Sequence, residues 1–518
     1  MDEKLNPAKK FFLIRFFNRH KYTFIFELIC IALCTYVIFI NTNTNIFQVL
    51  IIFILSLIFI FKPAFVIPIL FTCSLLTGNK FFVSYNDNGW DVEFAAIFIV
   101  CSLLYLIFIK DKFPKIPLRL ILFLIAFNTL NFISARYSLT GDLSAAIVMV
   151  LNTLVVFFMC LQRDIDAGYI INLMRICLSI FVLYIILFIM FGQPTFSGLR
   201  FTLTSRIAHN ELGTCLAQII ALFLALLIID DNILMKIYDL AVSIICLFLL
   251  FITGCRSGLI GVAGAFAFTL PVFIIVRLIV LIVKKDIKRL VIWGLALILV
   301  ASGIYAAYLN RDIIFEKYID IEYIQNYLDS NFFEKYLDIA FFDRYFNSDF
   351  IKRFFIENMI ESGASGRVEI WNALIDHVIP ENLMFGVGFG GINVTFALMP
   401  YISSLHQAHN FVLSIITQTG IVGSVLYFGF FLYFEIRSLI ALVKNKYIVV
   451  PIMLTLTAFI NGMGEDIIVE GFLWVAIGLG FMIIWQLKSD VSSEKSVVKE
   501  RSRKIRWKKK SIGIKEKI

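Results

Sequence analysis

Two of the chain's five histidines, His406 and His409, lie three residues apart in the segment SLHQAHN, which ends at Asn410. An apolar run begins at the next residue, Phe411. Histidine transfers protons near neutral pH, and asparagine is a preferred N-cap because its side-chain oxygen accepts the free N–H groups of a first helical turn. The spacing therefore predicts a proton-transferring group at the start of a helix. The alternative is that His409 only forms a structural hydrogen bond in the loop.

Arginines precede or begin two other apolar runs. Arg200 and Arg206 come before the segment HNELG, which contains Asn210, and Arg256 lies in TGCRSG. A further arginine, Arg367, lies in SGRVEIW. Guanidinium groups bind phosphate oxygens in a planar fork, and helix N-termini favour anions. We therefore expect Arg256 and Arg367 to contact a phosphate, with the other three residues in support. The alternative for Arg256 is a side chain that simply reaches the membrane interface.

The composition indicates what positions these residues. The chain is 60% hydrophobic and only 16% charged, whereas soluble proteins contain about 25% charged residues. Apolar runs of roughly 17–25 residues, the length of a membrane helix, recur along the chain. Because backbone in lipid must satisfy its own hydrogen bonds, these runs form helices. We predict an all-α polytopic membrane protein with about fourteen spans, near residues 22–40, 46–61, 63–78, 93–109, 119–135, 144–162, 169–191, 211–230, 235–253, 257–281, 290–308, 410–435, 447–463 and 471–487. Three of these helices have predicted N-caps, namely Asn210, Ser257 and Asn410.

Basic residues fix the expected orientation. With about fourteen spans, the lysine and arginine clusters all fall on the cytoplasmic side, as the positive-inside rule requires. Both termini are then cytoplasmic, and the net charge of +9 lies in loops and tails, so it predicts no nucleic-acid partner. The expected domains are spans at 1–308, an extracytoplasmic loop at 309–409, spans at 410–487 and a basic tail at 488–518. A near-repeat in the loop, FEKYIDI and FEKYLDI, predicts amphipathic helices that lie on the bilayer or stack aromatic rings on sugars.

Two other patterns have less specific explanations. The segment GVGFGG matches the spacing of dinucleotide-binding glycines at Gly386, Gly388 and Gly391, but no βαβ pattern surrounds it. We expect instead a tight turn that brings backbone N–H groups near the active face. The nine cysteines fall almost wholly within predicted spans and contain no C-x-x-C pair, so we expect packing residues and no metal or disulfide framework.

Taken in order, these motifs resemble the O-antigen polymerase and O-antigen ligase superfamily. The resemblance rests on HNELG, TGCRSG, SGRVEIW, GVGFG and a final His409–Asn410 that is followed by Gly420-x-x-Gly423. It covers roughly residues 195–435, whereas the preceding residues match only as membrane helices. HQAHN, with His406, matches the ligase-like form of the last motif.

The resemblance implies a glycosyltransferase C-type enzyme of the cytoplasmic (inner) membrane that acts on its outer face. Such enzymes transfer a glycan from undecaprenyl pyrophosphate to an acceptor hydroxyl, without a metal or other cofactor, because the donor is already activated. A polymerase joins lipid-linked repeat units of O-antigen, capsule or exopolysaccharide, whereas a ligase transfers glycan to a lipid or protein acceptor. We expect a polymerase, with the ligase as the alternative and a lipid-linked oligosaccharide flippase as a rival from another class. Expected partners are the lipid-linked oligosaccharide, membrane lipid and a chain-length regulator protein.

The expected roles follow from the residue types. Arg256 and Arg367 hold the pyrophosphate and stabilise its developing charge, and Arg200 is a second phosphate contact. His409 accepts the proton of the attacking hydroxyl, Asn410 fixes the helix start and His406 supports the acceptor. The alternative base is one of the acidic residues in the loop before the last span, which are Glu465, Asp466 and Glu470.

Overall fold

The computed structural model describes chiefly residues 63–81, 92–109, 118–202, 209–302, 365–402 and 407–487, with short gaps inside these ranges. The described helices of the membrane bundle are α3 (Val66–Thr77), α4 (Phe94–Phe108), α5 (Leu118–Arg136), α6 (Ser144–Leu161), α7 (Ala167–Phe191), α8 (His209–Ile229), α9 (Ile233–Thr253), α10 (Arg256–Lys284), α20 (Phe411–Leu442), α21 (Val449–Asn461) and a last helix at Gly471–Leu487. Two short antiparallel hairpins, β1 (Lys80–Phe81) with β2 (Val92–Glu93) and β3 (Thr195–Ser197) with β4 (Arg200–Thr202), lie in the connections.

The helical class predicted from composition is confirmed. Seven described helices are long and apolar enough to cross a membrane, and four shorter apolar helices accompany them. Together they correspond to eleven of the predicted spans (seven plus four). The spans predicted at 22–40 and 46–61, and most of the one at 290–308, lie outside the described residues. So do the near-repeat of the long loop and the basic tail, and the count of about fourteen spans stays a prediction.

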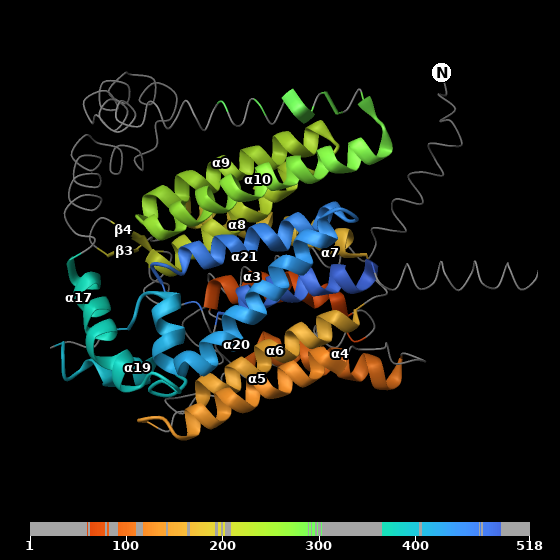
Figure 1. The fold of residues 1–518 in the computed structure, drawn as a ribbon. Helices are drawn as coiled ribbons and strands as arrows, with labels where there is room; N and C mark the ends of the chain where they lie inside the picture. Colours follow the sequence, from red (N-terminus) through yellow and green to blue (C-terminus); the bar gives the residue numbers. More distant parts are fainter. Residues whose placement is uncertain are drawn as a thin grey trace, which may run out of the picture.

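Helix α8 forms the centre of the bundle and packs against α3, α9, α10 and α21 (Figure 1). Nearly every side chain of α8 from Leu212 to Leu226 is buried. Close approach of α10 to α21 depends on Gly261, because a Cβ there would lie 2.9 Å from the carbonyl oxygen of Thr457. Small residues allow membrane helices to approach in this way.

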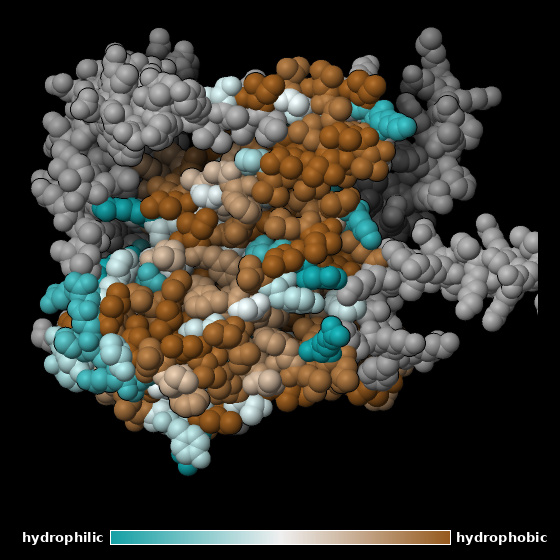
Figure 2. All heavy atoms as spheres, in the orientation of Figure 1, coloured by the Kyte–Doolittle hydropathy of each residue, from teal (hydrophilic) through white to brown (hydrophobic). Residues whose placement is uncertain are grey.

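The outward faces of the helices are apolar. Ile244 and Phe248 on α9, and Ile275 and Ile279 on α10, are exposed. Figure 2 shows hydrophobic residues over most of the described surface on this side of the bundle. A soluble protein rarely exposes so continuous an apolar surface, whereas lipid chains cover it without cost. The chain is therefore an integral membrane protein.

Helix α20 is divided at Gly420, whose backbone angles (φ 60°, ψ −165°) are non-helical. Its 32 residues would extend about 48 Å as one helix, which exceeds the roughly 30 Å of a bilayer core. The part after Gly420 has 22 residues and would extend about 33 Å. The second part alone is therefore long enough to span, which revises the span predicted at 410–435.

The glycine-rich segment 383–390 fills the break in α20. Four backbone hydrogen bonds join the segment to α20. After the break, the N–H groups of Ile421 and Val422 donate to the carbonyl oxygens of Leu383 (2.9 Å) and Met384 (3.2 Å). Before the break, the carbonyl oxygens of Thr417 and Gln418 accept from the N–H groups of Val387 (2.8 Å) and Gly388 (3.2 Å). Positive φ angles at Gly386 and Gly388 allow this contact. The backbone groups that the break in α20 frees are thus paired by protein, as a low-dielectric setting requires.

The N–H groups of Phe389 and Gly390 in the glycine turn are also paired. Phe389 donates to Oγ of Ser134 on α5 (2.9 Å), and Gly390 donates to Oε1 of Gln418 (3.0 Å). These N–H groups are therefore occupied within the protein, and a role of the turn at the active face stays a prediction. The turn joins α20 to α5.

Residues 365–402 form a small helical unit at one end of the bundle, which we call the cap. It contains α17 (Ser365–Ala373), the π-helical turn η5 (Leu374–Val378), α18 (Ile379–Glu381) and α19 (Gly391–Leu398). The cap has its own apolar core, formed mainly by Ile370, Leu374, Val378, Val394 and Leu398. Figure 1 shows α17 and α19 at the same end of the bundle as the β3–β4 hairpin.

Candidate functional site

Three chain segments that are distant in sequence meet beside the cap. Arg367 lies on α17, His409 directly precedes the N-cap of α20, and Glu465 follows α21. The Arg367 Nη2 atom lies 3.4 Å from Oε1 of Glu465, and the His409 Nδ1 atom lies 3.9 Å from its Oε2. One carboxylate thus lies between a fixed cation and a titratable imidazole. All three side chains are partly exposed, so a substrate can reach them.

The start of α10 forms another wall of this site. Arg256 is the first residue of α10, is half-buried, and is followed by Ser257. A Cβ at Gly464 would lie 2.9 Å from Cβ of Ser257 and 3.2 Å from Nη1 of Arg367. Gly464 therefore allows the start of α10, the Arg367 guanidinium and the Glu465 loop to approach one another. The helix N-terminus also favours an anion here.

Residues around Cys255 connect the site to the start of α8. The Cys255 thiol lies 3.8 Å from the carbonyl oxygen of Asn210, to which it donates, and 3.5 Å from Oγ of Ser257. Burial raises the pKa of the Cys255 thiol, so it stays protonated and serves in packing. The N-cap of α10 is Cys255, and α8 begins at His209. The predicted N-caps Ser257 and Asn210 are therefore wrong, since both lie inside the first turn.

Asn410 is the N-cap of α20, as predicted. Its Oδ1 atom accepts hydrogen bonds from the N–H groups of Val412 (3.0 Å) and Leu413 (3.1 Å), and its Nδ2 donates to the carbonyl oxygen of Met463 (3.3 Å). The next N–H, of Phe411, donates to the carbonyl oxygen of Gly462 (2.6 Å). Both ends of the Asn410 amide are thus occupied in fixing the helix start and the Glu465 loop, and its predicted contact with substrate stays a prediction.

The backbone at His409 is held in an unusual conformation. Its φ of 45° is left-handed, a region that non-glycine residues rarely adopt. The indole Nε1 of Trp371 donates to the carbonyl oxygen of the preceding residue, Ala408, at 2.9 Å. Trp371 lies one turn after Arg367 on α17, so one helix fixes both the cation and the histidine. Strain of this kind persists only where surrounding contacts impose it.

The other predicted site residues are placed less completely. Arg200 lies in β4, which packs beside α8 and α9 at this end of the bundle. Arg206 and His406 lie outside the described residues. Glu465 was predicted only as one of three acidic alternatives. Of the other two, Asp466 lies outside the described residues, and Glu470 directly precedes the last helix. The Trp371–Ala408 hydrogen bond was not predicted, and its only sequence signal is the spacing of Trp371 one turn after Arg367.

A comparison with known families gives one match over part of the chain. Residues 241–428 match the family described as O-antigen ligase. The match contains Arg256, Arg367 and His409, whereas Arg200 and Glu465 lie outside it. No curated protein matches the chain. Over residues 241–428, which are less than half of the chain, the sequence is thus similar to the O-antigen ligase family.

Proposed function

We propose that this chain is a polysaccharide polymerase, which joins oligosaccharide repeat units carried on undecaprenyl pyrophosphate. The family supports an O-antigen ligase- or polymerase-type function. The observation that carries the proposal is the cluster of Arg367, Glu465 and His409 beside the N-terminus of α10. It combines a fixed anion-binding group with a proton acceptor at the edge of the bundle. The cap would then face the outer side of the cytoplasmic membrane.

On the donor side, Arg256 and Arg367 would hold the pyrophosphate. Glu465 pairs with Arg367 at 3.4 Å, and the pyrophosphate oxygens would compete for that guanidinium. As the anomeric carbon–oxygen bond breaks, negative charge grows on the leaving pyrophosphate, and the two guanidinium groups would stabilise it. Arg200 and Arg206 would contribute charge from the connection that precedes α8. No metal or other cofactor is proposed, because the lipid pyrophosphate is itself the activated leaving group.

On the acceptor side, His409 would accept the proton of the attacking hydroxyl. Its Nδ1 faces Glu465, which leaves Nε2 to meet the hydroxyl. The carboxylate would stabilise the imidazolium that forms, as an acidic partner does in other histidine-based sites. The hydroxyl oxygen bonds to the anomeric carbon while undecaprenyl pyrophosphate departs, with inversion at that carbon. Glu465 itself is the alternative base, with His409 then orienting the hydroxyl.

The second candidate function is a ligase that transfers the glycan to a lipid or protein acceptor. The segment HQAHN favours it, since His406 and His409 there match the ligase-like form. A flippase is the rival from another class, and it needs no proton acceptor beside a phosphate site. A chain-length regulator protein would be a partner only of the polymerase.

The test is a reconstituted reaction. Purified protein is incubated with undecaprenyl-pyrophosphate repeat units and a chelator, and the products are resolved by length. A ladder supports the polymerase, and a single transfer that requires a core lipid or protein acceptor supports the ligase. His409→Ala, Arg256→Ala and Arg367→Ala should each abolish product, whereas exposed Glu369→Gln on α17 should not. If all three alanine variants form normal ladders, the assignment of the site is wrong.

A further inference from the structure

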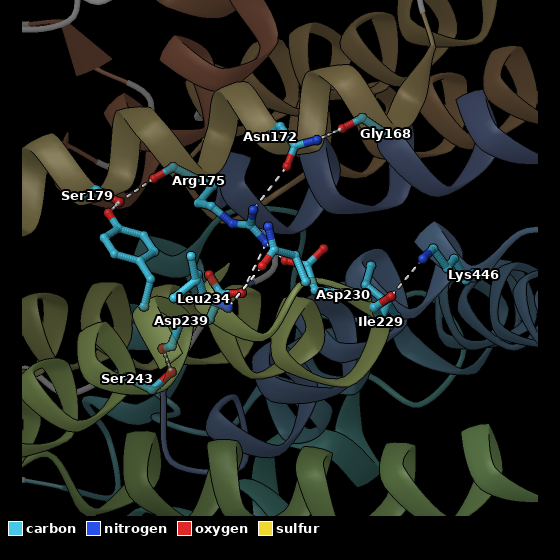
Figure 3. A network of polar contacts seen from close by, with 12 residues as sticks. Gly168, Asn172, Arg175, Ser179, Ile229, Asp230, Leu234, Asp239, Ser243 and Lys446 are labelled. Atoms are coloured by element: carbon cyan, nitrogen blue, oxygen red, sulfur yellow. Dashed lines mark hydrogen bonds and ion pairs between the residues drawn. The ribbon is translucent and has the colours of Figure 1, made fainter. Parts of the chain in front are cut away.

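A second group of charged side chains lies at the opposite end of the bundle. Arg175 on α7 faces Asp230, which directly follows α8, and Asp239 on α9 (Figure 3). Because α8 has 21 residues at about 1.5 Å each, its end lies about 30 Å from its start beside the candidate site. The group formed by Arg175, Asp230 and Asp239, which we call the buried triad, is therefore separate from that site.

The contacts within the buried triad converge on one nitrogen. Nη2 of Arg175 donates to Oδ2 of Asp239 at 3.0 Å and also to Oδ2 of Asp230. Nη1 donates to the Asn172 side-chain oxygen at 3.2 Å. The side chains of Arg175 and Asp239 are 6% and 0% exposed, whereas that of Asp230 is 20% exposed. Two carboxyl groups therefore share one cation in a nearly dry position.

The charges of the buried triad do not balance if every group is ionised. One guanidinium faces two carboxylates, which leaves one net negative charge. The second oxygen of Asp239, Oδ1, is buried and has no hydrogen-bond partner in the part of the chain that the structure describes. The nearby cation of Lys446 pairs with Asp231 at 2.5 Å, a carboxylate that is 92% exposed. An unpaired charge in such a position is strongly unfavourable, and a carboxyl group avoids it by binding a proton.

We propose that Asp230 and Asp239 together bind one proton, so that a single carboxylate remains to pair with Arg175. Two carboxyl groups that share one position cannot both ionise readily. A metal cation suits the position poorly, because such ions take about six oxygen ligands, whereas Asp239 directs one unpaired oxygen into it. This proton-binding site is independent of the transferase chemistry at the other end of the bundle.

Infrared spectroscopy of the purified full-length protein in lipid nanodiscs tests the proposal. Labelling all aspartates with carbon-13 distinguishes their carbonyl stretch from that of protonated glutamates. We expect a protonated-aspartate signal near neutral pH that disappears in Asp239→Asn and equally in Asp230→Asn, because either variant leaves one carboxylate for Arg175. Asp231→Asn is the matched control, since its exposed carboxylate should leave the signal unchanged.

Stability of the same variants provides a second measurement. Each single variant should unfold near the wild-type temperature, whereas the Asp230→Asn, Asp239→Asn double variant should unfold at a clearly lower one, because Arg175 then has no carboxylate. If Asp239→Asn removes only carboxylate signal, both groups are ionised and the proposal is wrong. It is also wrong if the protonated signal appears only after sodium is removed, since the site then holds a cation.

Discussion

Substitution of Glu465 by glutamine is the sharpest test of the candidate site. The change keeps the size of the side chain and an oxygen that can accept a hydrogen bond from Arg367, which lies 3.4 Å away. It removes the negative charge that faces Nδ1 of His409 at 3.9 Å. The imidazolium that forms when His409 takes a proton then loses its counter-charge. The perturbation therefore acts on proton transfer and leaves Arg367, the proposed phosphate ligand, in place.

The size of the effect follows from the geometry. A well-placed acid–base group contributes about 10²–10⁴-fold to a rate. The 3.9 Å separation is too long for a direct hydrogen bond, and the His409 side chain is 32% exposed, so water weakens the interaction. We therefore expect the lower limit, a fall in kcat of about 100-fold, which corresponds to about 2.7 kcal/mol. The KM for the donor should change by less than about threefold, because the loss is confined to the transition state.

The assay is the initial rate of chain extension at several concentrations of lipid-linked donor. Glu369→Gln provides the matched control, because this exposed glutamate lies on α17 two residues from Arg367. The reasoning is refuted if Glu465→Gln keeps at least a third of the wild-type kcat. It is also refuted if the KM of the donor rises while kcat is unchanged, since Glu465 would then act only through Arg367.

Three further substitutions test the surrounding structure. Gly464→Ala should lower kcat about tenfold or more, because the added Cβ would lie 2.9 Å from Ser257 and 3.2 Å from the Arg367 guanidinium. The control is Gly391→Ala, because nothing lies within 4 Å of a Cβ at that position. Equal rates for the two variants would contradict the prediction. Gly420→Ala should lower the free energy of unfolding by about 2 kcal/mol or more, because the backbone conformation at this position is restricted to glycine and the added Cβ would lie 2.4 Å from the backbone of Met384. Thermal unfolding in detergent measures this change. An unchanged midpoint temperature would count against the divided helix. Trp371→Phe should cost about 1 kcal/mol for the lost hydrogen bond and lower kcat more than it changes KM; steady-state kinetics that match the wild type would show that Ala408 needs no such contact.

Hydropathy predicted the helices well because the bilayer fixes their length. The ends were harder to predict. Helix α9 ends at Thr253, and its C-cap, Gly254, has the left-handed conformation (φ 69°), which leaves only Cys255 before α10. Arg256 therefore begins α10, and Ser257 is displaced from the N-cap position into the first turn. Neither end can be read from apolar length alone, because the closing turn depends on one glycine.

The division of α20 could not be read from hydropathy. Apolar residues continue on both sides of Gly420, so the run looks like a single span. The break depends on the glycine-rich segment some thirty residues earlier, whose backbone pairs with the freed groups. Both glycine motifs are visible in the sequence, but the contact between them depends on the tertiary fold.

The residue types of the candidate site came from the sequence, whereas their partners required the fold. Arginine and histidine residues at helix starts predicted a phosphate-binding group and a proton-accepting group. Those that lie within the described residues are found at one end of the bundle. The choice of Glu465 among three nearby acidic residues required the fold. It depends on the Phe411–Gly462 backbone bond and the Asn410–Met463 bond, which together fix the loop against the histidine. Such contacts between distant segments leave no periodic pattern in a sequence.

The backbone pairing at the break in α20 has a mechanical consequence. Two hydrogen bonds couple the cap to the longer part of α20 and two couple it to the shorter part, so the cap cannot rotate away from this helix without breaking them. Any displacement of His409 or Arg367 must be transmitted to the membrane helix as a rigid-body tilt or must first break that pairing.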